Sequence, residues 1–208
     1  MAVNKALETI RYCKECGQRL RPRWLGGEPR NHAWCDQCQE ARVDHPMVVV
    51  TCFVACGNKL LWVQRALEPR RGLWAIPGGY MEAEETLAQA AARELREEAG
   101  VDLDPDDLEL YMTGSITFIN QLYVAFRATV QCEDFAAGPE SLACAYYSRE
   151  DCPWEQVAYP EVNDCIEQAY DDLESGEFQV WQAEMVPGRY ELWPVPTTPL
   201  PETPPTGS

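Results

Sequence analysis

Apolar residues recur at helical spacing between Thr86 and Gly100, in a segment otherwise rich in glutamate, arginine and glutamine. The apolar stripe consists of Leu87, Ala88, Ala91, Ala92, Leu95 and Ala99. This spacing and this composition predict an amphipathic helix. Thr86 can cap the first turn with its hydroxyl group, and Gly100 can end the helix in a left-handed conformation.

Runs of β-branched and aromatic residues on both sides of this helix predict strands. Residues 47–56 and 59–65 flank Gly57-Asn58, a two-residue turn signal, and therefore predict a hairpin. Further strands are expected over 108–113, 117–130 and 142–147, a loop over 154–159, a second helix over 161–174 and a hairpin over 178–193.

Changes in composition divide the chain into four expected segments. These are a zinc ribbon over residues 1–45, a main domain over 46–175, a hairpin extension over 176–193 and a disordered proline-rich tail over 194–208. No apolar run approaches the ~20 residues that cross a bilayer, and the N-terminus lacks the hydrophobic region of a signal peptide. We therefore expect a cytoplasmic protein that does not associate with membranes.

Two short cysteine pairs lie near the N-terminus, Cys13 with Cys16 and Cys35 with Cys38, and eighteen residues separate the pairs. This spacing is typical of sites in which four thiolates bind a structural Zn²⁺. Free cysteines or a redox dithiol are alternatives, and the presence of two matched pairs favours zinc. The other cysteines fall mostly in apolar runs, where we expect buried free thiols rather than disulfides. They are Cys52, Cys56, Cys132, Cys144, Cys152 and Cys165.

A basic patch lies between the two cysteine pairs. It contains Arg19, Arg21, Arg23 and Arg30, with Trp24 and Trp34 among them. Arginines interleaved with aromatic residues can bind nucleic acid, and the alternative is a stabilised surface on a small ribbon. We favour the alternative, because the chain has 17 basic and 34 acidic residues and a net charge of −17. This charge opposes binding to nucleic acid and to anionic membranes.

Carboxylates gather on one face of the predicted helix. Glu94, Glu97 and Glu98 stand at positions i, i+3 and i+4, and Glu82 and Glu85 precede the helix. Such oxygen clusters suit Mg²⁺ or Mn²⁺, although an acidic helix face is more often only a solvated surface. The turn Pro77-Gly78-Gly79 leads into the helix, and its backbone carbonyls can also ligate a cation, which favours metal binding.

Residues 79–101 resemble the Nudix box of the Nudix hydrolases. The pattern is glycine, five residues, glutamate, seven residues, and then Arg-Glu-aliphatic-any-Glu-Glu-any-Gly-aliphatic. Its positions are filled by Gly79, Glu85, Arg93, Glu94, Leu95, Glu97, Glu98, Gly100 and Val101. The resemblance implies an α/β/α sandwich with a mixed sheet, preceded here by the zinc ribbon. It also implies metal-dependent hydrolysis of a nucleoside diphosphate linked to another group.

The resemblance further implies roles for the residues of the box. Glu94 and Glu98 would be ligands of Mg²⁺ or Mn²⁺ together with the Gly79 carbonyl, and Glu97 would be a ligand or the general base. Arg93 and Glu85 would form an ion pair that braces the helix. Glu84 stands where the family often has glycine, so the loop is expected to differ slightly in shape.

Candidate substrate contacts lie outside the box. Arg70 and Arg71 suit phosphate groups, and Trp74 would either stack on a base or pack in the core. Phe118 and Tyr123 offer further stacking faces, and Gln121 and Glu140 are further candidates. Relatives often have another glutamate at the position of Ala143, so the fourth carboxylate of the site is open. The branch of the family that acts on NADH carries Ser-Gln-Pro-Trp-Pro-Phe-Pro after the box, and this chain lacks that signature.

Without that signature, the chain more closely resembles the branch whose members hydrolyse FAD or ADP-ribose. This resemblance and the aromatic residues favour FAD first and ADP-ribose second as the substrate, cleaved to AMP and another monophosphate. The expected partner is thus a small dinucleotide or nucleotide sugar rather than nucleic acid, and a homodimer is left open. The alternative function is a non-catalytic Nudix-like domain that binds a nucleotide or a protein, with the ribbon as an interaction module. The complete set of glutamates favours the enzyme, because a binding domain has no need of them.

Overall fold

The computed structural model of the protein describes residues 10–27, 31–131 and 135–196. The chain divides into two compact units, Met1–Pro46 and Met47–Ser208. The expected tail from residue 197 onward, Arg30 of the basic patch and Cys132 lie outside the described residues.

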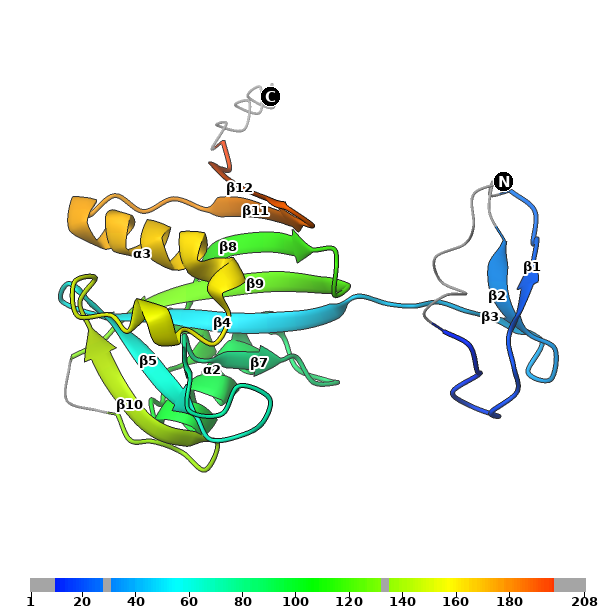
Figure 1. Ribbon diagram of the computed structural model, residues 1–208, viewed down its shortest axis with the longest axis horizontal. Coiled ribbons are helices and arrows are strands. Elements are labelled where there is room, and N and C mark those ends of the chain that lie inside the picture. The colour runs from blue at the N-terminus through cyan, green and yellow to red at the C-terminus, as the bar shows by residue number, and fades with distance from the viewer. Residues whose placement is uncertain (1–9, 28–30, 132–134, 197–208) are drawn as a thin grey trace, which may run out of the picture. The chain divides into compact units, whose positions relative to one another are not determined.

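The N-terminal unit is a small antiparallel sheet around a cysteine-rich core. Its strands, in sheet order, are β1 (Arg21–Arg23), β2 (His32–Cys35) and β3 (Glu40–Arg42) (Figure 1). The buried residues of this unit are Cys13, Leu20, Ala33 and Cys35. So few apolar side chains cannot stabilise an ordered domain of this size without a cross-link or a bound metal.

The C-terminal unit is built on a mixed sheet, in which the described residues supply nine strands. Seven of them follow the order β10-β5-β4-β9-β8-β11-β12, with β6 paired to β5 and β7 paired to β4. Their bounds are β4 Met47–Cys56, β5 Lys59–Arg65, β6 Trp74–Ala75, β7 Gly78–Tyr80, β8 Glu109–Ile116, β9 Gln121–Thr129, β10 Ser141–Tyr147, β11 Trp181–Val186 and β12 Arg189–Pro194. Strand β4 runs parallel to β9, and β8 runs parallel to β11, whereas the other pairs are antiparallel.

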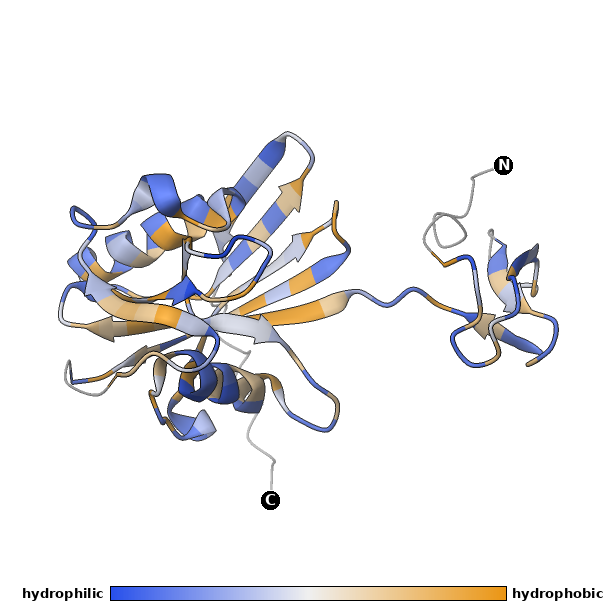
Figure 2. Cartoon of the chain, turned by 60° about the horizontal axis from the view of Figure 1, so that its bottom comes forward, coloured by the Kyte–Doolittle hydropathy of each residue, from blue (hydrophilic) through white to orange (hydrophobic). Residues whose placement is uncertain are grey.

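Helices cover both faces of this sheet, so the predicted α/β/α architecture behind an N-terminal ribbon is confirmed (Figure 1). Alternate residues of β4 enter two separate cores, with Val54 facing helix α2 (Leu87–Ala99) and Phe53 facing helix α3 (Asn163–Ser175). This explains why β4 is a continuous apolar run, because a central strand is buried on both faces. Figure 2 shows the same pattern, with apolar residues along the strands and polar residues on the outer surfaces of the helices.

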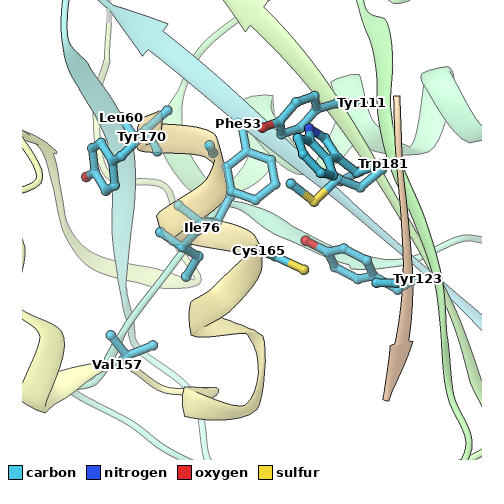
Figure 3. Close-up of a cluster of buried hydrophobic side chains, with 14 of the residues drawn as sticks. Phe53, Leu60, Ile76, Tyr111, Tyr123, Val157, Cys165, Tyr170 and Trp181 are labelled. Carbon is cyan, nitrogen blue, oxygen red and sulfur yellow. The ribbon is translucent and has the colours of Figure 1, made fainter. Parts of the chain in front are cut away.

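Helix α3 packs over an aromatic-rich core (Figure 3). Asp172 of this helix is a buried carboxylate. Tyr111 of β8 and Trp181 of β11 each donate a hydrogen bond of 2.8 Å to Asp172 Oδ2, and Gln168 donates to Oδ1. Buried polar groups are costly unless they are paired, so these contacts fix α3 against both strands. The C-terminal hairpin therefore completes the core rather than lying outside it.

Three short 3-10 helices lie in the connections, over Pro105–Asp107, Trp154–Gln156 and Pro160–Val162. Several expected boundaries were wrong, and the strand expected over 108–113 continues to Ile116. The strand expected over 117–130 begins only at Gln121, because residues 117–120 form the turn from β8 to β9, with Asn120 in a left-handed conformation. The expected second helix likewise begins at Asn163, after the last 3-10 turn. Residues 117–120 were expected to be strand because the turn contains the apolar residues Phe118 and Ile119.

Most of the described cysteines outside the ribbon are free, as expected: Cys52, Cys144, Cys152 and Cys165. Cys56 is an exception, because this buried residue is disulfide-bonded. The expectation of free thiols was wrong for Cys56, since it came from general cysteine chemistry and not from the neighbours of the residue. Among the described residues, the structure has no helix long and apolar enough to cross a membrane.

Candidate functional site

Local sequence fixes both ends of the helix that carries the candidate site. The Thr86 hydroxyl accepts a hydrogen bond from the Gln89 backbone N–H at 3.2 Å, and the Gln89 side chain accepts one from the Thr86 N–H at 2.8 Å. This reciprocal capping box satisfies backbone donors that the first turn leaves unpaired. Gly100 ends the helix with a φ of 65°. The predicted capping residues are therefore confirmed.

Arg93 connects three of the glutamates on this helix and its leading loop. Its guanidinium contacts both oxygens of Glu85, at 3.0 and 2.8 Å, and also donates to Glu94 at 2.8 Å and Glu97 at 3.1 Å. A further bond of 3.0 Å reaches the carbonyl of Tyr80 on β7. The contact with Arg93 lowers the pKa of Glu85, and the glutamates together raise the pKa of Arg93. Arg93 thus holds loop, helix and strand in one arrangement, as expected of a bracing residue.

Two more glutamates sit where the helix meets the glycine turn. A Cβ atom on Gly79 would lie 2.5 Å from Glu94 Oε1, so a side chain at this position would displace the carboxylate. The Gly78 N–H donates to Glu98 Oε2 at 2.9 Å. Glu98 is only 7% exposed, and burial raises its pKa to about 7 although the Gly78 bond opposes the shift. Burial also raises the pKa of Glu94.

The loop before β10 docks on the last turn of the same helix. The backbone N–H groups of Ala136 and Gly138 donate to the carbonyls of Ala99 and Glu98, at 2.8 and 3.0 Å. These are carbonyls that a helix C-terminus leaves without partners. A Cβ atom on Gly138 would lie 1.7 Å from the Glu97 carbonyl oxygen, so glycine is required for this approach.

The docked loop leads to Glu140, a candidate for the fourth carboxylate of the site in place of the glutamate that is absent at position 143. The negative charge of Glu140, which follows the docked loop, contributes to the raised pKa values of Glu94 and Glu98. The side chain of Ala143, by contrast, packs against the core on the α3 side of the sheet. In this chain the additional carboxylate near the site is therefore that of Glu140 and not one at position 143.

The carboxylate cluster fits a divalent cation in its chemistry. After burial, the negative charge of Glu140 helps to raise the pKa values of Glu94 and Glu98, and Glu94 also helps to raise that of Glu98, which means that the local arginines leave negative charge uncompensated. Carboxylate oxygens and a nearby backbone carbonyl are the ligands that Mg²⁺ and Mn²⁺ prefer. Glu94 and Glu97 are both bonded to Arg93, so a cation would share these two carboxylates with the arginine.

The arginines expected to bind phosphate differ in their surroundings. Arg70 donates to the carbonyl of Ala158, lies 3.4 Å from Glu161 and stacks 4.5 Å above the ring of Tyr159. These contacts engage its guanidinium and brace the loop before α3. Both Arg70 and Arg71 are exposed.

Arg65 at the end of β5 is a candidate that sequence reasoning missed. It lies close enough to Glu98 to lower the pKa of that carboxyl, against the larger effect of burial. Its Nε donates to the Pro69 carbonyl at 3.3 Å, and its guanidinium lies 5.5 Å from the ring of Tyr159. Arg65 pairs with Ser141 across the β5–β10 register, a proximity of two distant segments that no local motif signals.

Two other expected substrate contacts, Trp74 and Gln121, contact neighbouring side chains of the protein. Trp74 is 9% exposed and packs edge-on against Tyr147 with 5.2 Å between ring centroids, so it belongs to the core. Its ring offers no free face for stacking. Gln121, at the start of β9, donates to the hydroxyl of Tyr80 at 2.8 Å. Tyr80 directly follows Gly79 and is about half exposed, whereas Tyr123 is buried.

The four ribbon cysteines converge on one point. Their sulfur atoms all lie within 4.8 Å of one another, with 3.9 Å between Cys13 and Cys38 and 3.4 Å between Cys16 and Cys35. No other group of three or more acidic, histidine or cysteine ligands in the described part of the chain is as compact. Four converging thiols are the donor set of a structural zinc site.

The pKa values of these thiols also suit the binding of a divalent cation. Burial opposes ionisation of Cys13, yet backbone N–H groups of Cys16 and Glu15 and the side chain of Arg42 lower its pKa to about 6. The hydrogen bond with Cys16, together with burial, raises the pKa of Cys38 to about 12, because neighbouring thiols resist ionising together. A divalent cation would remove this mutual repulsion.

Two arginines of the basic patch are engaged within the ribbon. Arg23 stacks 4.2 Å above the ring of Trp34, and Arg21 lies 3.5 Å from Asp36. Trp24 is exposed. These contacts agree with the interpretation of the patch as a stabilised surface.

Comparison with known proteins gives consistent matches. The NUDIX domain model matches residues 45–168. A solved NUDIX hydrolase from Nitrosomonas europaea is 32% identical with a TM-score of 0.73, and the match covers 85% of this chain and 99% of that one. The NAD-capped RNA hydrolase NudC of Vibrio vulnificus is 27% identical over 149 residues, which are 71% of this chain and 51% of that protein. The chain therefore spans about half the length of this relative.

A shorter match involves an ADP-ribose pyrophosphatase of Methanocaldococcus jannaschii. It is 40% identical over 57 residues, which are 27% of this chain and 34% of that protein. The similarity is thus higher over a shorter segment than in the Vibrio protein.

Proposed function

Because the chain belongs to the NUDIX family, we propose that it is a divalent-metal-dependent pyrophosphohydrolase acting on a nucleoside diphosphate linked to another group. The observation that carries the proposal is the buried Glu98, held by the Gly78 N–H beside Glu94. Burying uncompensated carboxylates costs stability, so a fold that keeps them is expected to use them. Glu94, Glu97, Glu98 and the Gly79 carbonyl would hold Mg²⁺ or Mn²⁺.

The reaction is attack by a water oxygen on one phosphorus of the anhydride. The bridging phosphorus–oxygen bond breaks, and both products leave as monophosphates. A bound divalent cation supplies charge neutralisation of the diphosphate and a lower pKa of water. Glu97 or Glu98 accepts the proton of the attacking water, Arg93 orients Glu94 and Glu97, and Glu140 adds a carboxylate from the segment that follows the docked loop.

Phosphate binding poses an electrostatic problem for this unit. Residues 47–208 contain 9 of the 17 basic residues and 28 of the 34 acidic residues of the chain. An anionic substrate would be repelled unless cations and local arginines offset this charge. Arg65 and Arg71 are the proposed phosphate contacts, since Arg70 is occupied by Ala158, Tyr159 and Glu161.

We propose an ADP-containing diphosphate as the substrate, with ADP-ribose ahead of FAD. The similarity to an ADP-ribose pyrophosphatase supports the first choice. FAD was favoured partly because Trp74 could stack on a flavin, and the burial of Trp74 removes that support. The lack of a Ser-Gln-Pro-Trp-Pro-Phe-Pro segment after the box argues against NADH.

The test is a panel of ADP-ribose, FAD, NADH and an NAD-capped RNA oligonucleotide, each with Mg²⁺, Mn²⁺ or EDTA. Chromatography should identify AMP and ribose 5-phosphate from ADP-ribose, with no product in EDTA. Cleavage of the capped RNA alone would overturn the substrate choice and keep the reaction class. Tight binding of ADP-ribose without turnover of any substrate would instead favour a non-catalytic binding domain.

A further inference from the structure

Arg42 is the last residue of β3 in the ribbon, and its side chain reaches into the cysteine cluster. Its Nε donates to Cys13 Sγ at 3.2 Å, and its guanidinium also interacts with Cys38. The Arg42 side chain is only 15% exposed, and its outer edge donates to Glu40 at 2.9 Å. One arginine thus contacts a cysteine from each of the two pairs.

The contact of Arg42 with the sulfur atoms matters because thiolates bound to a metal carry negative charge. Four thiolates around a divalent cation leave two negative charges in a site where Cys13 and Cys35 are buried. Donors to the sulfur atoms are needed to stabilise that charge. Two other described arginines of the ribbon are directed elsewhere, with Arg21 beside Asp36 and Arg23 on Trp34. Arg42 is therefore placed to neutralise the sulfur cluster directly.

We infer that Arg42 is a positioning residue of the four-cysteine site, which holds the two cysteine pairs together and increases their affinity for Zn²⁺. The inference rests on the proposal that this cluster binds zinc. It also gives a physical reason for the Glu40 contact, because Glu40 fixes the guanidinium from the outer side. A purely structural Arg42 would stabilise the strand without changing metal affinity.

The experiment measures zinc affinity of the full chain by competition with a chromophoric chelator. Arg42→Met keeps the length and apolar stem of the side chain and removes its charge and donors. We expect a 10–100-fold weaker affinity, about the range seen when partners of metal ligands are removed. Arg42→Lys should recover part of the loss, because it restores the charge without the planar fork. Glu40→Gln should change affinity less than threefold.

Arg23→Met is the matched control, since it removes a ribbon arginine that stacks on Trp34. Equal affinity of Arg42→Met and the wild type would overturn the inference, and so would an equal loss in Arg23→Met. Cobalt substitution gives a second readout that does not depend on activity. If the Arg42→Met ribbon fails to assemble, the thiolate-to-cobalt absorption of Arg42→Lys at limiting Co²⁺ decides between the two outcomes. A wild type that binds neither metal would refute the zinc site itself.

Discussion

The chain prepares two sets of potential metal ligands in opposite ways. The ribbon brings four sulfur atoms within 4.8 Å of one another and surrounds them with backbone and arginine donors. The helix α2 site instead ties Glu94 and Glu97 to Arg93 and keeps Glu98 buried with a raised pKa. The first arrangement is closed and suits a permanent soft-ligand metal. The second arrangement keeps carboxylate charge that the local arginines do not balance, which suits cations that arrive with an anionic substrate.

The two regions differ in what stabilises their clusters of potentially negative side chains. In the ribbon, little apolar surface is buried, so a metal bound to the cysteine cluster would have to supply folding free energy. In the larger unit, two apolar cores stabilise the sheet. The buried carboxylates lower the free energy of unfolding, and the stability from the two cores offsets this loss. Loss of metal should therefore unfold one region and only inactivate the other.

The largest effect is expected from removing a ribbon ligand. Cys35→Ser should abolish tight zinc binding and unfold residues 10–45, because structural zinc contributes roughly 10–16 kcal/mol to the folding of small zinc domains. Elemental analysis should find one zinc per wild-type chain and none in the variant, and hydrogen exchange should show loss of protection in this segment. Retained activity toward the substrate of the wild type would confirm that the two regions are energetically separate. Unfolding of the whole chain would contradict the comparison.

Removing a buried carboxylate should inactivate the second site without unfolding it. Glu98→Gln keeps the shape and the acceptor for the Gly78 N–H, and Glu97→Gln changes the exposed neighbour. Each should lower kcat on the order of 10²–10⁴-fold, while the metal-free melting temperature of Glu98→Gln stays the same or rises. Glu191→Gln on β12, at the far edge of the sheet, is the matched control. Wild-type turnover in both helix variants would refute the assignment.

Sequence reasoning succeeded where the determining contacts are local. Thr86 and Gly100 are readable as caps because their partners lie within a few residues. It failed where partners are distant in the chain. The role of Arg65 depends on the β5–β10 register, and the burial of Trp74 depends on Tyr147. The docking of Gly138 on α2 likewise depends on how a distant loop meets a helix end, which no periodicity encodes.

Removing the arginine brace should have an intermediate effect. Arg93→Ala would release Glu85, Glu94 and Glu97 together, and carboxylates so released repel one another and lose their orientation. We expect a roughly 10–100-fold lower kcat/KM, the range for partners that orient metal ligands. Arg93→Lys should not restore activity, because an ammonium group cannot contact both Glu85 oxygens and two further carboxylates. Full rescue by lysine would show that charge alone suffices.

The metal affinity of the carboxylate site should depend on pH through the ionisation of Glu98. The pKa of Glu98 rises from 4.5 to about 7 on folding, so the neutral acid is favoured in the metal-free protein. Its contribution to stability is complete below pH 4.5 and is lost as the pH rises through about 7. Metal binding requires the ionised form, so Mn²⁺ affinity should fall by up to about tenfold per pH unit below 7. Calorimetry of wild type and Glu98→Gln tests this, because the variant should lose the pH dependence.

The smallest effect concerns backbone strain in the two regions. In the ribbon, the residue after each cysteine pair is left-handed, and the first of these is glycine, Gly17, with a φ of 74°. In the loop before α2, Glu84 has a φ of 71°, a conformation that costs a residue with a Cβ roughly 1–2 kcal/mol. The loop therefore places Glu84 in a backbone conformation that glycine would favour.

Glu84→Gly should relieve this strain at some cost in unfolded-state entropy, for a net gain of about 0.5–1 kcal/mol. Glu84→Ala is the matched control, because it removes the same exposed carboxylate and keeps the left-handed Cβ. Urea denaturation should show a gain for glycine and none for alanine. An equal gain in both variants would assign the effect to charge repulsion in the acidic loop. Activity should change less than twofold in either variant, because Arg93 and not residue 84 holds Glu85 in place.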